Sequence, residues 1–458
     1  MRSPGEFRQL VTIAVPVVLV QVGLMFMGVV DTLMVGHVSA EALAAVSLGN
    51  LYFYNAVVVG MGTLMALDPL VSQAVGARDD TGVTRAIQRG LLLSVFLSIP
   101  TMLVMLPADP VLHLFRQPPT IIPDAGAYTR IGATSILPFL VFVVLRQSLQ
   151  AVGSLSAIVW TIVIANLLNV VLNWALIFGR LGAPSMGVRG AAIATVISRW
   201  AMAVMLLALA WRELRPHLTR LDRASLGASA LWRTLTLGLP IGIQQFLEVS
   251  SFAAVGLLMG TFGVQQVASH QIALNMAALT FMVPLGVSAA AAVRVGNAIG
   301  AGDAPRSRRA AKLSYAVGTG FMCATAVMFL VFPEELASLY TNDVGIIAIA
   351  GLLIPIAGAF QVFDGLQAVG AGVLRGLGDT RVPLVAMLAG YWLIGIPVSV
   401  VLGFFTELGP VGLWWGFVAG LAAVAAFLLV RVRVMFARGV GRVLVDATAM
   451  ADSGSAVR

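Results

Sequence analysis

The chain has 458 residues and a mass of 48.0 kDa, a length that would suit about three soluble domains. Its composition excludes them, because 59% of the residues are hydrophobic and only 10% are charged, whereas a typical soluble domain is about a quarter charged. So few charges cannot cover the whole chain with a water-exposed surface. Lipid must therefore surround most of this protein.

The net charge of +8 and the single cysteine limit the function classes further. A basic chain can bind nucleic acid, but basic residues clustered in short loops between apolar segments usually follow the positive-inside rule of membrane proteins. We therefore expect no nucleic-acid partner. Cys323 alone cannot form an internal disulfide, and no Cys/His spacing indicates a structural metal, so we expect no cofactor.

Apolar segments long enough to cross a membrane follow one another along the chain. A helix needs about 20 apolar residues to cross the roughly 30 Å of hydrocarbon in a bilayer. The first such segment follows Arg2 and Arg8 without a small-residue cleavage site, so we interpret it as a retained helix rather than a signal peptide. Twelve helices are predicted, near residues 10–35, 44–72, 88–107, 126–150, 157–178, 187–211, 232–260, 268–293, 311–332, 346–374, 383–405 and 411–435.

The basic residues predict how these helices are oriented. With a cytoplasmic N-terminus, the basic clusters around Arg85, Arg220 and Arg309 all lie on one side, together with the tail from residue 431 onward. Arg199 lies within a span. Because cytoplasmic loops are enriched in Lys and Arg, this distribution favours twelve spans with both termini in the cytoplasm. The other side receives only Arg116, Arg130, Arg180 and Arg189.

The second half of the chain repeats features of the first half at a constant offset. Pro16 corresponds to Pro240, and the run Ala74–Asp79 corresponds to Ala298–Asp303. Single Gly and Pro identities arise wherever helices pack or kink, but a shared offset indicates an internal duplication. We therefore predict a six-helix lobe with its linker at residues 1–222 and a six-helix lobe with a cytoplasmic tail at residues 223–458. Parallel repeats around a central cavity are typical of secondary transporters.

Three of the 20 acidic residues lie well inside predicted spans: Asp31 in the first helix, Glu248 in the seventh and Asp364 in the tenth. Asp68 lies near a predicted helix end, from which it could reach the membrane interface. A charge at bilayer depth costs about 2.5–3.5 kcal/mol or more, and such residues commonly bind ions or protons. Pairing with Arg or capping of a broken helix is the structural alternative, but few Arg residues lie at matching depth.

The three acids do not follow the repeat, since Asp31 corresponds to Val255 and Glu248 corresponds to Leu24. We therefore expect one acidic site for cation or proton coupling in the N-terminal lobe and a separate pair, Glu248 and Asp364, in the C-terminal lobe. The pair is also the candidate Na⁺ site.

Polar and aromatic residues near the acids are predicted to support these sites and to line a substrate cavity. The Asn residues at spacings of three and four share one helical face, and an aromatic ring one turn before an acid suits an organic cation. Hydrogen bonding between helices and ordinary packing are the alternative roles. The predicted supporting residues are Asn166, Asn169, Asn173, Gln245, Asn275, Phe360 and Gln361.

Four motifs together resemble the multidrug and toxic compound extrusion (MATE) family, and within it the bacterial NorM-type branch. Their order and spacing carry the resemblance, which covers essentially the whole chain. The motifs are Val30–His37 on the first helix, Asp68–Ala77 closing the second, Asn169–Gly179 on the fifth and Val373–Thr380 after the tenth.

This resemblance implies an all-α protein with two pseudo-symmetric six-helix lobes in a V shape. It implies export of amphipathic, mostly cationic compounds from the bacterial cytoplasm across the inner membrane, by a monomer in contact with membrane lipid. Inward Na⁺ or H⁺ would be exchanged as the lobes rock. Asp31, Glu248 and Asp364 match the family's coupling acids, whereas some relatives have Asp where this chain has Asn173.

Two other functions compete with this interpretation. Export or flipping of lipid-linked or polyisoprenoid substrates occurs on the same repeat architecture, but it favours several basic residues in the cavity, and the charges within these spans are mainly acidic. A membrane-embedded enzyme would need a nucleophile with a base, or metal ligands. The four His residues are scattered and no Gly-x-Ser-x-Gly motif occurs, so we expect no enzyme.

Overall fold

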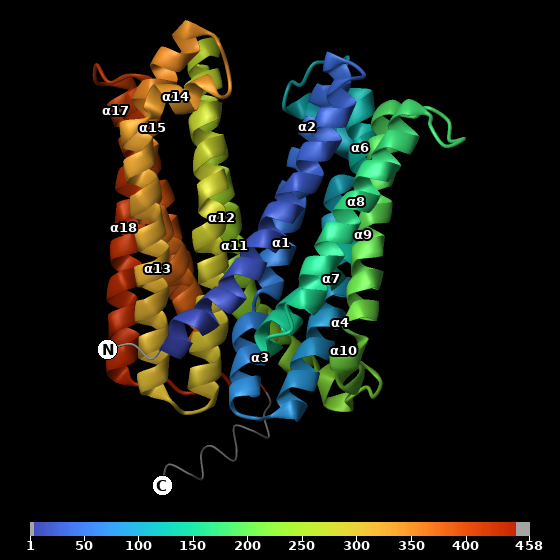
Figure 1. Ribbon diagram of the computed structural model, residues 1–458, viewed down its shortest axis with the longest axis vertical. Coiled ribbons are helices and arrows are strands. Elements are labelled where there is room, and N and C mark those ends of the chain that lie inside the picture. Colours follow the sequence, from blue (N-terminus) through green and yellow to red (C-terminus); the bar gives the residue numbers. More distant parts are fainter. Residues whose placement is uncertain (1–3, 446–458) are drawn as a thin grey trace. The chain divides into compact units, whose positions relative to one another are not determined.

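The computed structural model describes residues 4–445, and the regular secondary structure of this part of the chain is helical throughout (Figure 1). Arg2 and the predicted tail beyond residue 445 lie outside the described residues. Eleven helices within the described part are long and apolar enough to cross a membrane, and a bent pair of helices gives a twelfth span. The predicted all-α membrane fold is therefore confirmed.

The first half of the chain contains one broken span and one bent span. A short break separates α2 from α3, and the two are counted together as one span, Ala40–Gly76. The bent pair, α6 and α7, meets at 50° and occupies the fourth predicted span. The helices of this half are α1 (Pro4–Gly36), α2 (Ala40–Leu64), α3 (Leu67–Gly76), α4 (Asp80–Met105), α5 (Ala108–Leu114), α6 (Ile122–Ala133), α7 (Ile136–Val152), α8 (Ser156–Phe178), α9 (Gly187–Leu209) and α10 (Trp211–Leu218).

The second half contains a π-helical segment, η2, in the middle of its fifth span. This segment joins α16 and α17 into one membrane-crossing helix, Arg381–Phe404. The elements of this half are the 3₁₀ turn η1 (Arg223–Leu226), α11 (Ala228–Gly260), α12 (Val264–Gly300), α13 (Ala304–Val331), α14 (Pro333–Ser338), α15 (Val344–Gly376), α16 (Arg381–Met387), η2 (Leu388–Gly395), α17 (Ile396–Phe404) and α18 (Pro410–Arg438).

Contacts between residues divide the chain into two compact units. Unit 1 contains the described residues up to Val18 together with Ser72–Arg78 and Ile243–Val443. Unit 2 contains Leu19–Val71, Asp79–Gly242 and the residues from Leu444. The boundaries after Val18 and Gly242 fall at equivalent positions of the repeat. Since α1 and α11 each contribute to both units, the division into residues 1–222 and 223–458 stays a prediction.

Each unit has an apolar core between side-by-side helices. In unit 1, α12, α13, α15 and α18 lie side by side (Figure 1). They pack around Trp414, Phe360 and Phe417, whose rings meet edge to face. In unit 2, α2, α6 and α9 pack around Tyr128 and Ile177. Burial of apolar surface stabilises a protein by roughly 25 cal/mol per Å² only where the surface is removed from water. Between helices surrounded by lipid, the association of the helices depends mainly on close van der Waals packing.

An Asp that recurs in both halves of the repeat caps the start of one helix in each unit. Asp79 and Asp303, which are equivalent in the repeat, each accept a hydrogen bond from the backbone of the following helix, at 2.8 Å from Gly82 N and from Arg306 N. These contacts cap the starts of α4 and α13 and satisfy N–H groups that have no partner within the helix. The recurring Asp therefore has a structural role.

A seam of small residues in unit 1 brings η2 against α18. A Cβ atom on Gly420 would lie 2.8 Å from the backbone oxygen of Gly390 and 2.9 Å from the Cα atom of Gly395. Only glycine fits at such distances, so these residues let the two backbones approach closely. Pro397, at the start of α17, cannot donate a backbone hydrogen bond, and a wider π-helical turn accommodates this loss.

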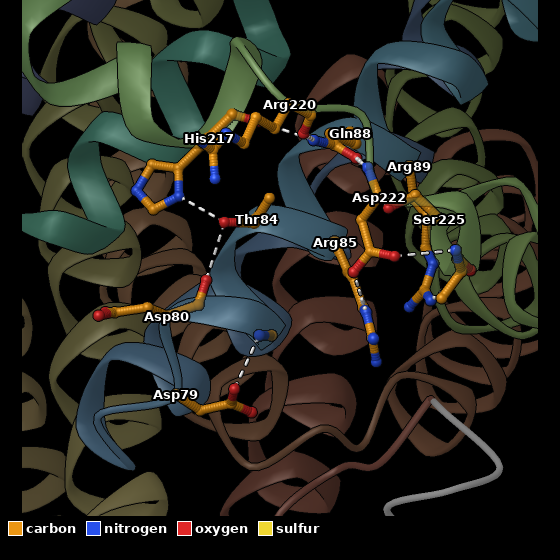
Figure 2. A network of polar contacts seen from close by, with 12 residues as sticks. Asp79, Asp80, Thr84, Arg85, Gln88, Arg89, His217, Arg220, Asp222 and Ser225 are labelled. Atoms are coloured by element: carbon orange, nitrogen blue, oxygen red, sulfur yellow. Dashed lines mark hydrogen bonds and ion pairs between the residues drawn. The ribbon is translucent and has the colours of Figure 1, made fainter.

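The link between the two halves is docked on α4 within unit 2 (Figure 2). The amide of Gln88, which is 5% exposed, donates to the backbone oxygens of His217 and Arg220, both at 2.8 Å. Its oxygen accepts from the backbone of Asp222 at 3.0 Å and from Ser225 Oγ at 2.9 Å. One side chain of α4 therefore satisfies four groups of the link.

Charged and polar pairs complete this docking. Arg85 Nε lies 2.7 Å from Asp222 Oδ2, and Thr84 Oγ1 lies 2.7 Å from His217 Nδ1 (Figure 2). Because the Thr84 hydroxyl donates to the backbone oxygen of Asp80, we infer that His217 Nδ1 is the donor. Burial lowers the pKa of His217, and the nearby charge of Asp80 opposes this shift.

Candidate functional site

Asp31 lies near the end of α1 in unit 2 and is 0% exposed. Its Oδ1 accepts hydrogen bonds from the side-chain amides of Asn169 at 3.2 Å and Asn173 at 2.6 Å. Its Oδ2 accepts from Thr195 Oγ1 at 2.5 Å and from Tyr128 OH at 3.3 Å. Four donors therefore surround one carboxylate, which matches its full capacity to accept.

The donors to Asp31 come from three helices. Asn169 and Asn173 are four residues apart on α8, so they lie one turn above each other on one face, and Asn173 also donates to Asn169 Oδ1 at 3.2 Å. Tyr128 belongs to α6, where its hydroxyl also lies 3.0 Å from Asn50 Oδ1. The packing of α6, α8 and α9 around the end of α1 thus builds the site.

Glu248 and Asp364 form a second acidic site, in unit 1. The Nε2 atom of Gln367 lies 3.0 Å from Glu248 Oε1 and 3.2 Å from Asp364 Oδ1. Because this nitrogen carries two hydrogens, it can donate one to each carboxylate. Asp364 is 4% exposed and Glu248 is partly buried, so a single amide bridges two acids away from bulk water.

The π-helical segment η2 contributes to this second site. The hydroxyl of Tyr391 lies 3.3 Å from Glu248 Oε1, and Trp392 Nε1 donates to the backbone oxygen of Leu247 at 3.2 Å. Consecutive residues of η2 therefore contact consecutive residues of α11. π-Helical turns occur frequently at functional sites, which agrees with this position.

The two sites differ in their electrostatics. The four donors around Asp31 occupy the accepting positions of one carboxylate. By contrast, two carboxylates that share one amide repel each other unless a proton or a cation lies with them. Among residues 4–445, no Lys, Arg or His forms an ion pair with any of the three acids.

The oxygen atoms around Glu248 and Asp364 have the chemistry that a small hard cation prefers. The Oε1 atom of Gln367 is buried and has no hydrogen-bond partner in the described chain. The side chain that bridges the two carboxylates therefore also has an amide oxygen available. The residues that the structure describes contain no group of three or more His, Cys, Asp or Glu suited to a metal ion. The Na⁺ site therefore stays a prediction.

Three of the predicted supporting residues have their described contacts with groups other than the acids. Asn166 donates to the backbone oxygens of Gly23 at 3.0 Å and Ile162 at 2.9 Å, so it joins α8 to α1. Phe360 is 1% exposed within the aromatic core of unit 1. Asn275 is exposed on α12, where it accepts from Gln271 at 3.2 Å.

Two predicted glutamines lie on the helices of the second site. Gln245 precedes Glu248 by three residues on α11. Gln361 precedes Asp364 by three residues on α15, and its oxygen accepts from Thr280 Oγ1 at 2.6 Å. The Nε2 atom of Gln361 is buried without a hydrogen-bond partner among residues 4–445. This amide is available to a ligand or a water molecule.

Sequence reasoning missed several contacts of the acids and misplaced one acid. Tyr128, Thr195 and Tyr391 carry no sequence signal, because hydroxyl residues are common in membrane helices and their partners lie far away in the chain. Arg199 could be recognised as a charge within a span, but its place near Asp31 could not. Asp68, which could have reached the membrane interface from the predicted helix end, is instead 0% exposed at the start of α3.

Solved structures of other proteins share this fold. The "eukaryotic MATE transporter AtDTX14" is 23% identical, with a TM-score of 0.85 over 94% of this chain and 96% of that chain. The "Vibrio cholerae MATE transporter VcmN in the bent form" is 21% identical, with a TM-score of 0.84 over 95% of this chain and 98% of that chain. This chain therefore shares the helical fold of these two structures, and its helical spans are those of a multi-pass membrane protein.

Sequence relatives identify the family. The MatE family model matches residues 16–175 and 240–401, two segments that begin at the equivalent residues Pro16 and Pro240 of the repeat. "Multidrug resistance protein NorM" of Burkholderia vietnamiensis is 37% identical over 91% of each chain. "Multidrug resistance protein MdtK" of Yersinia pseudotuberculosis is 34% identical over 93% of this chain and 95% of its own. The chain belongs to the MatE (MATE) family of transporters.

Proposed function

We propose that this protein is a multidrug efflux transporter that works as a secondary active antiporter. It exports amphipathic, mostly cationic compounds in exchange for Na⁺ or H⁺ that moves inward. The names of the bacterial relatives support drug export. The observation that carries antiport is the bridged pair Glu248 and Asp364, because two neighbouring carboxylates within membrane-crossing helices require a proton or cation to balance them.

The proposed mechanism is competition for buried negative charge. The same carboxylates cannot bind a coupling ion (a proton or Na⁺) and a cationic drug at the same time. Binding of one therefore promotes release of the other. Transport also requires that the affinities differ between the inward-open and outward-open states, since equal affinity would shift no equilibrium. We propose that the two states interconvert by rocking motions, which give alternating access.

The two acidic sites have different proposed roles. Glu248 and Asp364, with Gln367 between them, form the candidate Na⁺ or proton site. Asp31, held by Asn169 and Asn173, is a second coupling acid. Gln361, whose Nε2 atom has no hydrogen-bond partner among residues 4–445, contributes to the substrate route. The expected roles of Gln245, Asn275, Asn166 and Phe360 in the cavity belong to the same proposal.

The cellular setting follows from the same proposal. The protein acts as a monomer in the bacterial cytoplasmic membrane, with both termini in the cytoplasm and lobes formed by residues 1–222 and 223–458. It uses no cofactor other than the coupling ion. Its partners are small organic cations and membrane lipid.

A transport assay in proteoliposomes tests the proposed function. Purified protein is reconstituted, a fluorescent organic cation is loaded, and Na⁺ and H⁺ gradients are imposed separately. One gradient, or each of them, should drive counter-movement of the dye, and dissipating that gradient should stop it. If neither gradient drives transport of any of several organic cations, the proposal of antiport is contradicted. Export of lipid-linked substrates then becomes the next function to assay.

A further inference from the structure

Of the arginines on the helices that surround Asp31, Arg199 is the one whose charge acts on this acid. Arg199 is on α9, one turn after Thr195, in a segment long and apolar enough to span a membrane. Its Nη1 atom donates to Ser135 Oγ at 2.9 Å, and its Cζ atom lies 3.6 Å from the centre of the Phe53 ring. A hydrogen bond and a cation–π contact therefore fix the guanidinium in place.

The guanidinium acts on Asp31 without pairing with it. The charges of Arg199 and Asp31 are close enough to interact, but no carboxylate of the described residues forms an ion pair with Arg199. The other groups that face Asp31 are the Tyr128 hydroxyl from α6, the Thr195 hydroxyl from α9 and the amides of α8. Among residues 4–445, the guanidinium of Arg199 is thus the one charged group near Asp31.

A small cavity lies against the side chains that carry these hydroxyls. Tyr128 and Thr195, which both contact Asp31 Oδ2, also line the cavity, and Arg199 forms part of the same wall. The remaining lining residues are small or apolar, except for Thr129. Two residues whose hydroxyls contact Asp31 therefore also line this cavity, and a fixed positive charge lies in the same wall.

This arrangement discriminates between a proton and a metal cation. A fixed positive charge beside a route of low polarity raises the energy of any cation that must enter it with its full charge. A proton can instead cross by transfer along hydroxyl groups: a protonated water in the cavity gives its excess proton to the Thr195 oxygen and is left as neutral water, while the Thr195 hydroxyl hydrogen passes to Asp31 Oδ2. Asp31 becomes a neutral carboxylic acid, and no heavy atom crosses the route.

We propose that Arg199 makes the cavity beside Asp31 a proton-selective entrance, through which Asp31 exchanges protons while Na⁺ is excluded. The proposal rests on the proposed function in taking Asp31 as a coupling acid. It adds that the two acidic sites have different ion selectivity. Removal of the guanidinium should therefore open the site of Asp31 to Na⁺.

Binding of radioactive Na⁺ to purified protein tests this inference without any transport step. The parent protein carries Glu248→Gln and Asp364→Asn, so that Asp31 is the remaining buried acid of the two sites. This parent should show no saturable Na⁺ binding that depends on Asp31. Adding Arg199→Gln should create such binding, so that the bound Na⁺ rises at least tenfold above the background of the parent, and adding Asp31→Asn should remove it. Arg199→Lys, which keeps the charge, should behave like the parent.

Infrared difference spectra of the same parent provide the proton measurement. A change of pH should produce a carboxylic-acid band that Asp31→Asn removes, and Na⁺ should not shift the midpoint of this band. Na⁺ binding to Asp31 in the parent, or a midpoint that shifts with Na⁺, overturns the inference even if Arg199→Gln fails to fold. Failure of transport in proteoliposomes would instead count against the proposed function, because these two measurements need no gradient.

Discussion

At the scale of single residues, the buried acids have two different hydrogen-bonding environments. Asp31 has four hydrogen-bond donors for one carboxylate, whereas Glu248 and Asp364 share the two hydrogens of a single amide nitrogen. The first arrangement satisfies a negative charge. The second leaves a surplus of negative charge that a proton or cation must balance. The repeat has therefore kept its helices while the chemistry of its halves has diverged.

Neutralising any one of these acids should stop efflux. Asp31→Asn, Glu248→Gln and Asp364→Asn each remove a charge that binds the coupling ion, so drug efflux should fall by at least about tenfold, which corresponds to ~1.4 kcal/mol. Dye efflux and drug resistance are measured in cells, with membrane expression quantified by immunoblot. Glu334→Gln, on the short helix α14, is the control and should keep full efflux. Full activity in all three variants would contradict the roles proposed for the acids.

Replacing the bridging amide should weaken ion binding without removing a charge. Gln367→Leu deprives two carboxylates of a donor, and hydrogen bonds to charged groups contribute about 1.5–3 kcal/mol. The concentration of the coupling ion needed for half-maximal transport should therefore change by roughly 10- to 100-fold. The measurement is dye efflux from proteoliposomes as a function of Na⁺ concentration and pH. Gln117→Leu, on an exposed segment, should leave both dependences unchanged.

At the scale of elements, the link between the halves is a docked part of unit 2. Gln88 alone satisfies four groups of the link, and Arg85 pairs with Asp222 (Figure 2). A buried amide with all its partners present stabilises the contact, whereas removing it leaves four polar groups to find water. Gln88 therefore makes the largest number of the hydrogen bonds that hold the link on α4, beside those of Thr84 and Arg85.

Gln88→Ala should release the link while leaving the membrane helices folded. The link contains several exposed arginines, so trypsin should cleave it faster than in the unaltered protein, by about tenfold for ~1.4 kcal/mol of lost docking energy. Cleavage is followed by mass spectrometry of the fragments under native conditions. Gln117→Ala serves as the matched control. Equal cleavage rates in Gln88→Ala and the unaltered protein would show that Gln88 does not hold the link.

Docking of the link should also weaken in mildly acidic solution. Because burial lowers the pKa of His217, the undocked link binds more protons than the docked link, and docking loses stability as the pH falls below about 6.5, the ordinary pKa of histidine. The hydrogen bond from Arg85, with the N–H of Ala224, lowers the pKa of Asp222, so this acid stays ionised there and weakens docking only below about pH 4.

Hydrogen exchange of residues 211–227 at pH 7.5 and pH 5.5, corrected for the intrinsic rates, measures this effect. Protection should decrease at pH 5.5 in the unaltered protein. His217→Asn keeps a donor to Thr84 but does not titrate, so its protection should not change between the two pH values. A decrease of the same size in His217→Asn would assign the effect to another group.

At the scale of the whole molecule, the sequence was sufficient for the spans and for the acids inside them. Hydropathy and rare charges are local signals, and so Asp31, Glu248 and Asp364 could be identified without a structure. The contacts of the acids could not, because Thr195 and Tyr391 meet them only through the packing of helices that lie far apart in the chain. The buried position of Asp68 depends on the break between α2 and α3, which hydropathy does not reveal.

The predicted topology can be tested with two introduced cysteines. In a Cys323→Ser background, Asn342→Cys lies between α14 and α15 and Arg306→Cys lies in the first turn of α13, and both positions are exposed. With twelve spans and a cytoplasmic N-terminus, a membrane-impermeant maleimide added to intact cells should label the cysteine at 342. The cysteine at 306 should be labelled only after the membrane is opened. The reverse pattern would invert the predicted orientation.

The π-helical turn of η2 has a consequence for how this span can change in evolution. Its hydrogen bonds connect residues five apart rather than four, so Leu388–Gly395 contains one residue more than an α-helical path would need. Elsewhere in a span, a deletion rotates all later side chains by about 100°. Here a single deletion would let α16 and α17 run on as one regular helix with both flanks in register. Gain or loss of one codon, rather than substitution, is thus a short route by which relatives can acquire or abandon the contact between Tyr391 and Glu248.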